Sequence, residues 1–265
     1  MPRSVGLRLA AALLRASRAL GDGRLSLRAA PSGSWGSFNE DATSGLRYQL
    51  ECLEAAVPGL EELPDSFPLD RPALARLIKA NFRRHRGGAA QLAEGYSALD
   101  QGFAALRAIS EQLYLQQCSS SGSEEGVVVE VTSKWLGTTE DLPSGETKHA
   151  FTYRVRVTNG RTSSIQVLGR SWDIVDGAGT LVGHITLSPE NGVVGQQPVI
   201  PPGATFEYVS GSVLGTAGGL MQGRLAVAEL RGLRQWQAGD EWFKVPIKPF
   251  ALMRPQSGGG GGGGG

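Results

Sequence analysis

The sequence is poor in the residues that build metal centres and disulfide frameworks. Among its 265 residues are two cysteines and three histidines. Cys52 and Cys118 lack a CxxC spacing, so we expect neither a metal knuckle nor a disulfide, and we expect a reducing compartment. His85, His149 and His184 are too scattered for a zinc-type spacing. We therefore expect no metal centre and no bound cofactor.

The sequence also lacks a strong charge imbalance, a bilayer-length apolar run and a catalytic motif. Its formal net charge of +1 gives no whole-protein electrostatic footprint for DNA. Arginines interrupt the apolar stretch near the N-terminus before it is long enough to span a bilayer. No serine lies in a GxSxG setting, and acid pairs such as Glu61-Glu62 and Asp240-Glu241 fall in expected loops. We expect a protein that is not an enzyme and has no membrane span.

The first forty residues differ in composition from the rest. Six arginines lie there among leucine, alanine and serine, and Asp22 is the only acid before Glu40. This composition is typical of an organellar transit peptide, which we place at residues 1–40. We expect the mitochondrial matrix, with the plastid as the alternative. The competing interpretation is a basic amphipathic first helix of the mature protein.

Residues 41–117 carry the apolar spacing of three amphipathic helices. The first begins near Leu46. The second has Asp70 as a suitable N-cap, and the third runs from about Leu92 to Tyr114. Three helices of this size predict a compact bundle.

The second of these helices has a basic face. Its cations recur at steps of three, four and three residues, at Arg76, Lys79, Arg83 and Arg86. Such a stripe would attract an acidic partner helix and raise its association rate. One alternative is a solvated face that keeps the protein soluble. Another is contact with RNA phosphates, which we disfavour because no aromatic platform for bases is visible.

This helical region resembles a LYR-type (complex 1 LYR) domain. The resemblance rests on Ala80-Asn81-Phe82-Arg83-Arg84-His85-Arg86, the helix after it and the closing Gln112-Leu113-Tyr114. The family's first helix carries Leu-Tyr-Arg, whereas this chain has Leu46-Arg47-Tyr48. The family is largely mitochondrial and binds an acyl carrier protein, whose acyl-phosphopantetheine enters between the helices. The resemblance implies partner contacts at Arg47, Tyr48, Phe82 and Arg83, to which the basic stripe adds Arg76, Lys79 and Arg86.

Residues 126–254 carry the pattern of a β-sandwich. From Phe151 to Val157 apolar and polar residues alternate, as in a half-buried strand. Seven apolar runs predict seven strands, at residues 127–131, 151–157, 165–175, 181–187, 206–214, 225–230 and 243–247. Asn159-Gly160 and Asp176-Gly177 are expected to join antiparallel neighbours. The serine-rich and acidic run at residues 118–125 predicts a linker.

Five motifs in this region resemble an ApaG domain in their order. They are Val167-Leu168-Gly169-Arg170-Ser171-Trp172, Gly192-Val193-Val194-Gly195-Gln196-Gln197-Pro198, Pro202-Gly203, Tyr208-Val209-Ser210-Gly211 and Gly219-Leu220-Met221-Gln222-Gly223. The resemblance covers about residues 126–253 and implies an immunoglobulin or fibronectin type III-like sandwich without a settled activity. Some eukaryotic proteins that carry this domain suggest a ubiquitin-pathway substrate adaptor.

The ApaG family also carries a GxGxxG-like signature that is sometimes connected with pyrophosphate binding. Here Glu190 replaces its first glycine, and the run lies between expected strands, so we interpret Gly192 and Gly195 as turn or bulge positions. Arg170 and Trp172 lie two positions apart on one strand. Their side chains either form an exposed cation and aromatic patch or pack at the sandwich edge. These four residues are the candidate ApaG-domain surface.

The expected fold class is α+β multidomain, a three-helix bundle followed by an all-β sandwich, with a disordered glycine-rich tail at residues 255–265. The expected function is a non-catalytic mitochondrial adaptor or assembly protein. Its helical module would bind an acyl carrier protein, and its sandwich would dock a respiratory complex, the iron-sulfur machinery or a ribosome. The alternatives are a pyrophosphate or nucleotide module and a ubiquitin-pathway adaptor.

Overall fold

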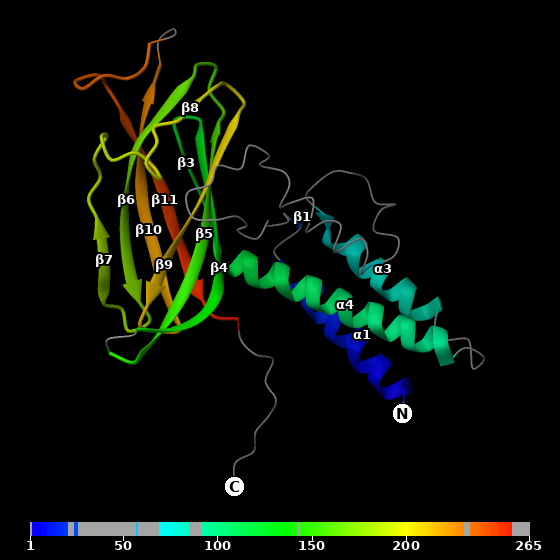
Figure 1. The fold of residues 1–265 in the computed structure, drawn as a ribbon. Coiled ribbons are helices and arrows are strands. Elements are labelled where there is room, and N and C mark those ends of the chain that lie inside the picture. Colours follow the sequence, from blue (N-terminus) through cyan, green and yellow to red (C-terminus); the bar gives the residue numbers. More distant parts are fainter. Residues whose placement is uncertain are drawn as a thin grey trace. The chain divides into compact units, whose positions relative to one another are not determined.

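A computed structural model describes residues 2–20, 24–25, 57, 69–84, 92–141, 144–230 and 234–255. The chain divides into two compact units (Figure 1). The described residues up to Gln117 form a helical unit, and those from Cys118 onward form an all-β unit. The expected glycine-rich tail lies outside the described residues, apart from Pro255.

The helical unit contains α1 (Pro2–Ala19), α3 (Arg71–Arg84) and α4 (Leu92–Gln117). A short antiparallel pair of strands, β1 (Arg24–Leu25) and β2 (Leu69–Asp70), belongs to the same unit. Helix α1 contacts both α3 and α4. The three helices bury one apolar cluster, which includes Leu9, Leu13, Leu20, Leu74, Ile78, Ala105 and Ile109.

Helices α3 and α4 confirm two of the expected helices. The helix expected near Leu46 lies outside the described residues. Helix α1 lies in the segment expected to be a transit peptide, and its Leu9 and Leu13 are buried against the other two helices. Cleavage of that segment stays a prediction. No described helix is long and apolar enough to cross a membrane.

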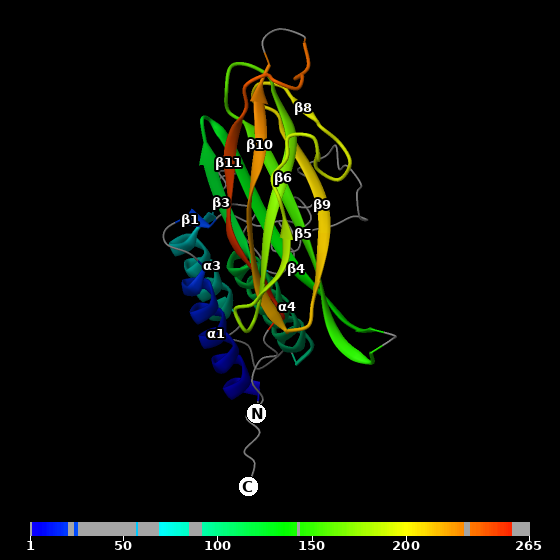
Figure 2. The same cartoon turned by 90° about the vertical axis from the view of Figure 1, so that its left-hand side faces the viewer.

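The all-β unit is a sandwich of two antiparallel sheets (Figure 2). The four-stranded sheet has the order β3-β4-β5-β9 and contains β3 (Ser119–Glu124), β4 (Val127–Asp141), β5 (Glu146–Asn159) and β9 (Thr205–Leu214). The other has the order β11-β10-β6-β7, with β8 also paired to β6. It contains β6 (Ile165–Asp176), β7 (Leu181–Ile185), β8 (Val199–Ile200), β10 (Gly218–Glu229) and β11 (Phe243–Met253). The sandwich is confirmed, and its immunoglobulin or fibronectin type III-like class stays a prediction.

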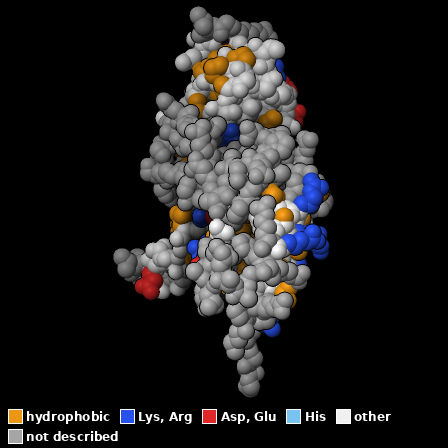
Figure 3. All heavy atoms as spheres, turned by 90° about the vertical axis from the view of Figure 1, so that its right-hand side faces the viewer, with side chains coloured by type: hydrophobic (Ala, Val, Ile, Leu, Met, Phe, Trp, Pro, Cys, Tyr) orange, Lys and Arg blue, Asp and Glu red, His pale blue; other side chains and the backbone are white. Residues whose placement is uncertain are grey.

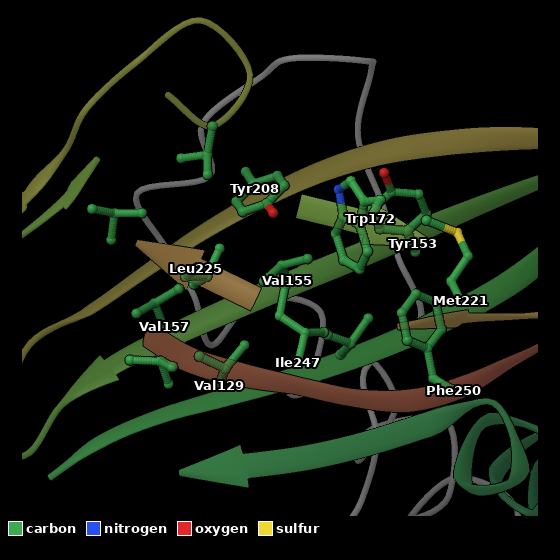
Figure 4. Packing of buried hydrophobic residues seen from close by; sticks show 14 of the residues in the cluster. Val129, Tyr153, Val155, Val157, Trp172, Tyr208, Met221, Leu225, Ile247 and Phe250 are labelled. Carbon is green, nitrogen blue, oxygen red and sulfur yellow. The ribbon is translucent and has the colours of Figure 1, made fainter. Parts of the chain in front are cut away.

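The core lies between the two sheets (Figure 4). Along β5, Phe151, Tyr153, Val155 and Val157 are all buried, as the alternation in the sequence predicts. Each such burial stabilises the fold by about 1.5–3 kcal/mol relative to leaving the side chain in water. The seven apolar runs therefore correspond to the strands β4, β5, β6, β7, β9, β10 and β11.

The linker expected at residues 118–125 is wrong, because Ser119–Glu124 is strand β3, paired along its length with β4. Its polar side chains belong to an edge strand that touches the other sheet. Ser120 Oγ donates a hydrogen bond of 2.7 Å to the main-chain oxygen of Lys248 in β11. A Cβ at position 122 would lie 2.5 Å from the main-chain oxygen of Pro246, so Gly122 permits this close approach. With β3 and the short β8, the described residues of the sandwich form nine strands where seven were expected.

The two expected hairpin turns have different outcomes. Asp176-Gly177 does join β6 to its antiparallel neighbour β7, and Asp176 Oδ1 accepts hydrogen bonds from the amides of Ala178 and Thr180. Asn159-Gly160 joins β5 to β6, which belong to different sheets, so that prediction is wrong. The Asn159 side chain is buried and bonds main-chain groups instead of forming a tight hairpin.

The two sides of the sandwich differ. On one side β3 contacts β11, so the two sheets meet there. On the other side the sheets end in β9 and β7.

Candidate functional site

The main-chain segment after β7 is tied to β6 by an arginine and a glycine. Arg170 in β6 is half-buried, and its Nη1 donates a hydrogen bond of 2.8 Å to the main-chain oxygen of Gly192. The amide of Gly192 donates one of 2.8 Å to the main-chain oxygen of Leu168. Arg170 and Gly192, two of the four residues of the candidate ApaG-domain surface, are therefore in contact, although 22 positions separate them in the sequence.

Trp172 is not part of an exposed patch, because only 1% of its surface is accessible. Its ring lies 5.4 Å from that of Tyr153 and 6.0 Å from that of Phe250, in edge-to-face arrangements that stabilise aromatic clusters. On the inner face of β6, its neighbours are core residues. The exposed patch is wrong for Trp172. The alternative, packing at the sandwich edge, is correct in that the ring is packed, but the ring lies in the core between the sheets and not at the edge. Gly192 is also buried, whereas Gly195 is exposed.

Two tyrosines with raised pKa values lie beside this cluster. Burial raises the pKa of Tyr208 strongly, the phenol of Tyr153 raises it further, and the positive charge of Arg170 opposes both. Burial also raises the pKa of Tyr153, against a hydrogen bond with Ser210 and the charge of Arg170. Both phenols are therefore neutral at pH 7. Among the described residues, Tyr208 Oη and Trp172 Nε1 are buried without a hydrogen-bond partner (Figure 4).

The glycine-rich segment forms a two-residue hairpin turn. The amides of Val193 and Gln196 each donate to the other's main-chain oxygen, at 2.8 and 3.0 Å. Val194 and Gly195 between them have φ of 45° and 79°, the type I′ pattern. A Cβ at Gly192 would lie 2.7 Å from the main-chain oxygen of Gln196. This geometry supports the interpretation of the glycines as turn positions.

The same hairpin is poorly suited to cradle a phosphate. A phosphate loop offers several free amides. Here the amides of Gly192, Val193 and Gln196 already donate within the protein, which leaves those of Val194 and Gly195. The positive charge of Arg170 is directed to a main-chain oxygen of the loop. No helix follows the segment, since β8 and β9 come next.

Val194 is an unusual residue for the first turn position. A β-branched side chain with φ of 45° is a backbone outlier, and asparagine or glycine is preferred there. The Val194 side chain is half-buried and packs against the sandwich core. The strain is therefore balanced by an apolar contact that asparagine or glycine would not make.

The outward face of the four-stranded sheet carries an ion-pair network. Arg154 Nη1 lies 3.6 Å from Glu207 Oε1, and Arg156 Nε lies 3.4 Å from Glu207 Oε2. Arg156 Nη1 is also 3.5 Å from Glu130 Oε2. Glu207 is 5% exposed and Arg154 is 6% exposed, so their charges depend on each other. Sequence reasoning missed this network, because it depends on the register of β5 with β9.

Helix α3 presents its predicted basic stripe to solvent. Arg76, Lys79 and Arg83 are exposed, while Leu74 and Ile78 are buried. Basic side chains gather along one border of the face drawn in Figure 3. The other expected partner contacts, Arg47, Tyr48 and Arg86 and the side chain of Phe82, lie outside what the structure describes.

Comparison with known proteins identifies the family of the sandwich. The ApaG domain family model matches residues 139–229. Protein ApaG of Methylorubrum extorquens strain PA1 is 33% identical over 130 residues, which are 49% of this chain and 89% of the relative. Protein ApaG of Bordetella pertussis is 37% identical over 131 residues, with the same two shares. This chain belongs to the ApaG family.

A solved structure named as an ApaA protein of Bordetella pertussis is 35% identical, covering 49% of this chain and 95% of that one, with a TM-score of 0.39. The ApaG family match includes the end of β4 and all of β5 to β10, and so contains Arg170, Trp172 and the hairpin at Val194. The helical unit lies outside the ApaG family match. Its LYR-like character stays a hypothesis.

Proposed function

We propose that this protein is a non-catalytic adaptor of mitochondria, in which the helical unit recruits an acidic protein and the ApaG sandwich docks a second protein or a larger assembly. The observation that carries the proposal is the separation of the two faces of α3. Leu74 is fully buried and Ile78 is 3% exposed, while three cations at steps of three and four face solvent.

Two cations of this face, Lys79 and Arg83, are available to a partner. Lys79 and Arg83 are exposed and make no ion pair with the described residues. Arg76 lies on the same face and has a contact within the chain. Exposed cations such as Lys79 and Arg83 raise the association rate of an acidic partner, and added salt screens that attraction.

The acidic partner that the LYR-like resemblance implies is an acyl carrier protein. Its acyl-phosphopantetheine would be the partner's cofactor, and this chain would contribute the basic face that meets the partner's acidic helix. A respiratory complex, the iron-sulfur machinery and a ribosome are the assemblies to which the sandwich would dock. A ubiquitin-pathway adaptor is the competing function, and residence of the full-length protein in the cytosol would favour it.

The test is binding of purified full-length protein to an acylated acyl carrier protein at two salt concentrations. Lys79→Glu with Arg83→Glu should weaken binding at least about tenfold at low salt, because two attractions become repulsions. Arg8→Glu with Arg15→Glu is the matched control, since it makes the same charge change at exposed positions of α1. Equal losses in the two double variants would contradict the proposal, as would the absence of binding by the unmodified protein.

A pyrophosphate or nucleotide module is less well supported, because most amides of the Gly192 to Gln196 segment are engaged. A ligand that binds the folded state must raise its melting temperature. We expect no such shift with pyrophosphate or dinucleoside polyphosphates.

A further inference from the structure

Strand β7 is an edge strand with an unusually apolar surface. Among the residues that the structure describes, no strand neighbours its outer edge in the sheet. Every residue from Leu181 to Ile185 is exposed except the half-buried Gly183. Eight large apolar side chains are exposed on the described part of the sandwich, and this five-residue strand supplies three of them: Leu181 at 56%, Val182 at 53% and Ile185 at 37%.

The other end of the same sheet is protected against pairing. Strand β11 contains Pro246 and Pro249, which lack an amide donor, and Lys244 and Lys248, whose charges oppose the approach of another strand. Strand β3 also packs on β11. Such devices prevent edge-to-edge association. Strand β7 contains no proline, lysine, arginine or carboxylate.

The single titratable side chain of β7, that of His184, is bonded to other residues of the same chain. Nδ1 of His184 lies 2.7 Å from Oδ1 of Asp173 in the neighbouring strand β6, and its Nε2 lies 3.2 Å from Oγ1 of Thr186. Both ring nitrogens are therefore engaged within the chain. Val182 is the extra residue of a register shift between β6 and β7, so it has no partner opposite it on β6.

We infer that β7 pairs with β7 of a second copy of this chain, antiparallel across a twofold axis. An unpaired strand edge offers alternating donors and acceptors, and an antiparallel copy presents the complementary set. A second copy brings no charged residue to the contact, so the two edges do not repel each other. The chain's net charge of +1 gives no long-range repulsion either.

The length of the strand sets the strength of the contact. Five residues on each side form a short interface, well below the roughly 1,200–2,000 Å² of a standard stable complex. The dimer is therefore weak and depends on concentration. The pairing is independent of the function proposed for α3, because it involves different residues of a different unit.

The test is sedimentation velocity of the full chain from about 1 µM to about 500 µM, the range in which weak interfaces associate. The unmodified protein should form a dimer as concentration rises. Val182→Lys should weaken it at least about tenfold, because a lysine on the edge protects it. Val213→Lys is the matched control, since Val213 is a valine of the edge strand β9 with 52% exposure, and it should dimerise like the unmodified protein.

Hydrogen exchange locates the contact without a substitution. The amides of residues 181–185 should exchange more slowly in the unmodified protein as its concentration rises. A protein that stays monomeric over the whole range overturns the inference, which would leave β7 to a different partner. The inference is also overturned if Val182→Lys and Val213→Lys weaken dimerisation equally. It is overturned as well if dimers form while the amides of β7 gain no protection from hydrogen exchange.

Discussion

The guanidinium of Arg170 donates a hydrogen bond of 2.8 Å to the main-chain oxygen of Gly192, 22 residues further along the chain. Gln197 Nε2 adds bonds to the main-chain oxygens of Leu168 and Pro189. The segment between β7 and β8 is therefore fixed to β6 by side-chain contacts as well as by its own hairpin. Because this segment is anchored at several points, changes in its turn should appear in the stability of the sandwich.

The hairpin at Val194 offers a direct measure of backbone strain. Val194→Ala removes the apolar contact but keeps a side chain that disfavours positive φ. Val194→Asn removes the same contact and places a residue that tolerates this conformation. We expect Val194→Asn to be more stable than Val194→Ala by about 1 kcal/mol, the cost of left-handed backbone for an ordinary residue. Urea unfolding of the two variants gives this difference.

Val213 is the control for this comparison, because it is an exposed valine in an extended strand and has no positive φ. Val213→Asn should gain no such advantage over Val213→Ala. An alanine variant at position 194 as stable as the asparagine variant would mean that the turn relaxes on substitution.

Tyr208 should make the protein less stable at alkaline pH. Its pKa in the folded state is raised above the ordinary value of 10.0, chiefly by burial. Above pH 10 the unfolded chain loses this proton while the folded one keeps it, so the free energy of unfolding falls as pH rises. Tyr208→Phe should reduce that fall. Urea unfolding between pH 8 and pH 11 measures both slopes.

The same variant has an expected effect at neutral pH. Tyr208 Oη is buried without a partner among the described residues, so removing it relieves a desolvation cost. We expect Tyr208→Phe to raise the free energy of unfolding by about 1 kcal/mol at pH 7. Tyr153→Phe is the contrasting variant, because Tyr153 has a hydrogen bond with Ser210 to lose. A clear loss of stability in Tyr208→Phe would reveal a partner for the phenol.

The sandwich could be predicted from the sequence because the alternation of apolar and polar residues within a strand shows which of its faces is buried. The alternation from Phe151 to Val157 is visible without any partner strand, and so is the Asp176-Gly177 turn. Strand β3 could not be found this way, because Ser119–Glu124 contains no apolar side chain. Its position depends on pairing with β4 and on the space that Gly122 leaves for β11.

The candidate site was predictable only in part. Arg170 and Gly192 belong to separate motifs, so their contact depends on the fold of the segment between β7 and β8. The orientation of Trp172 depends on which face of β6 is buried. The partners of Arg154 required the register that sets it opposite Val209 and brings Glu207 within reach. In the same way, the exposure of β7 follows from its place at the end of a sheet, which the apolar pattern of the strand does not reveal.

Glu207 should be essential for the stability of the outward face. Glu207→Gln removes the carboxylate that neutralises Arg154 and Arg156, and Arg154 is almost fully buried. Removing one partner of a buried ion pair costs about 3–5 kcal/mol. Glu130→Gln is the matched control in the same network, and it should cost less because the Glu130 side chain is 31% exposed. Chemical denaturation measures both, and equal losses would show that burial does not set the cost.

Asn159 should hold together the connection between the two sheets. Its Nδ2 donates to the main-chain oxygens of Ser163 and Ile200 at 2.8 and 2.9 Å, and its Oδ1 accepts from the amide of Arg161 at 3.0 Å. Asn159→Ala leaves these groups without that partner inside the protein, so we expect a loss of about 2–4 kcal/mol. Asn159→Asp restores the acceptor but neither donor, and it also buries a negative charge, so it should not rescue stability at pH 7. Urea unfolding near pH 4 should show a smaller loss of stability in the aspartate variant, because protonation removes that charge. An aspartate variant as stable as the original protein at pH 7 would refute the role of the two donated bonds.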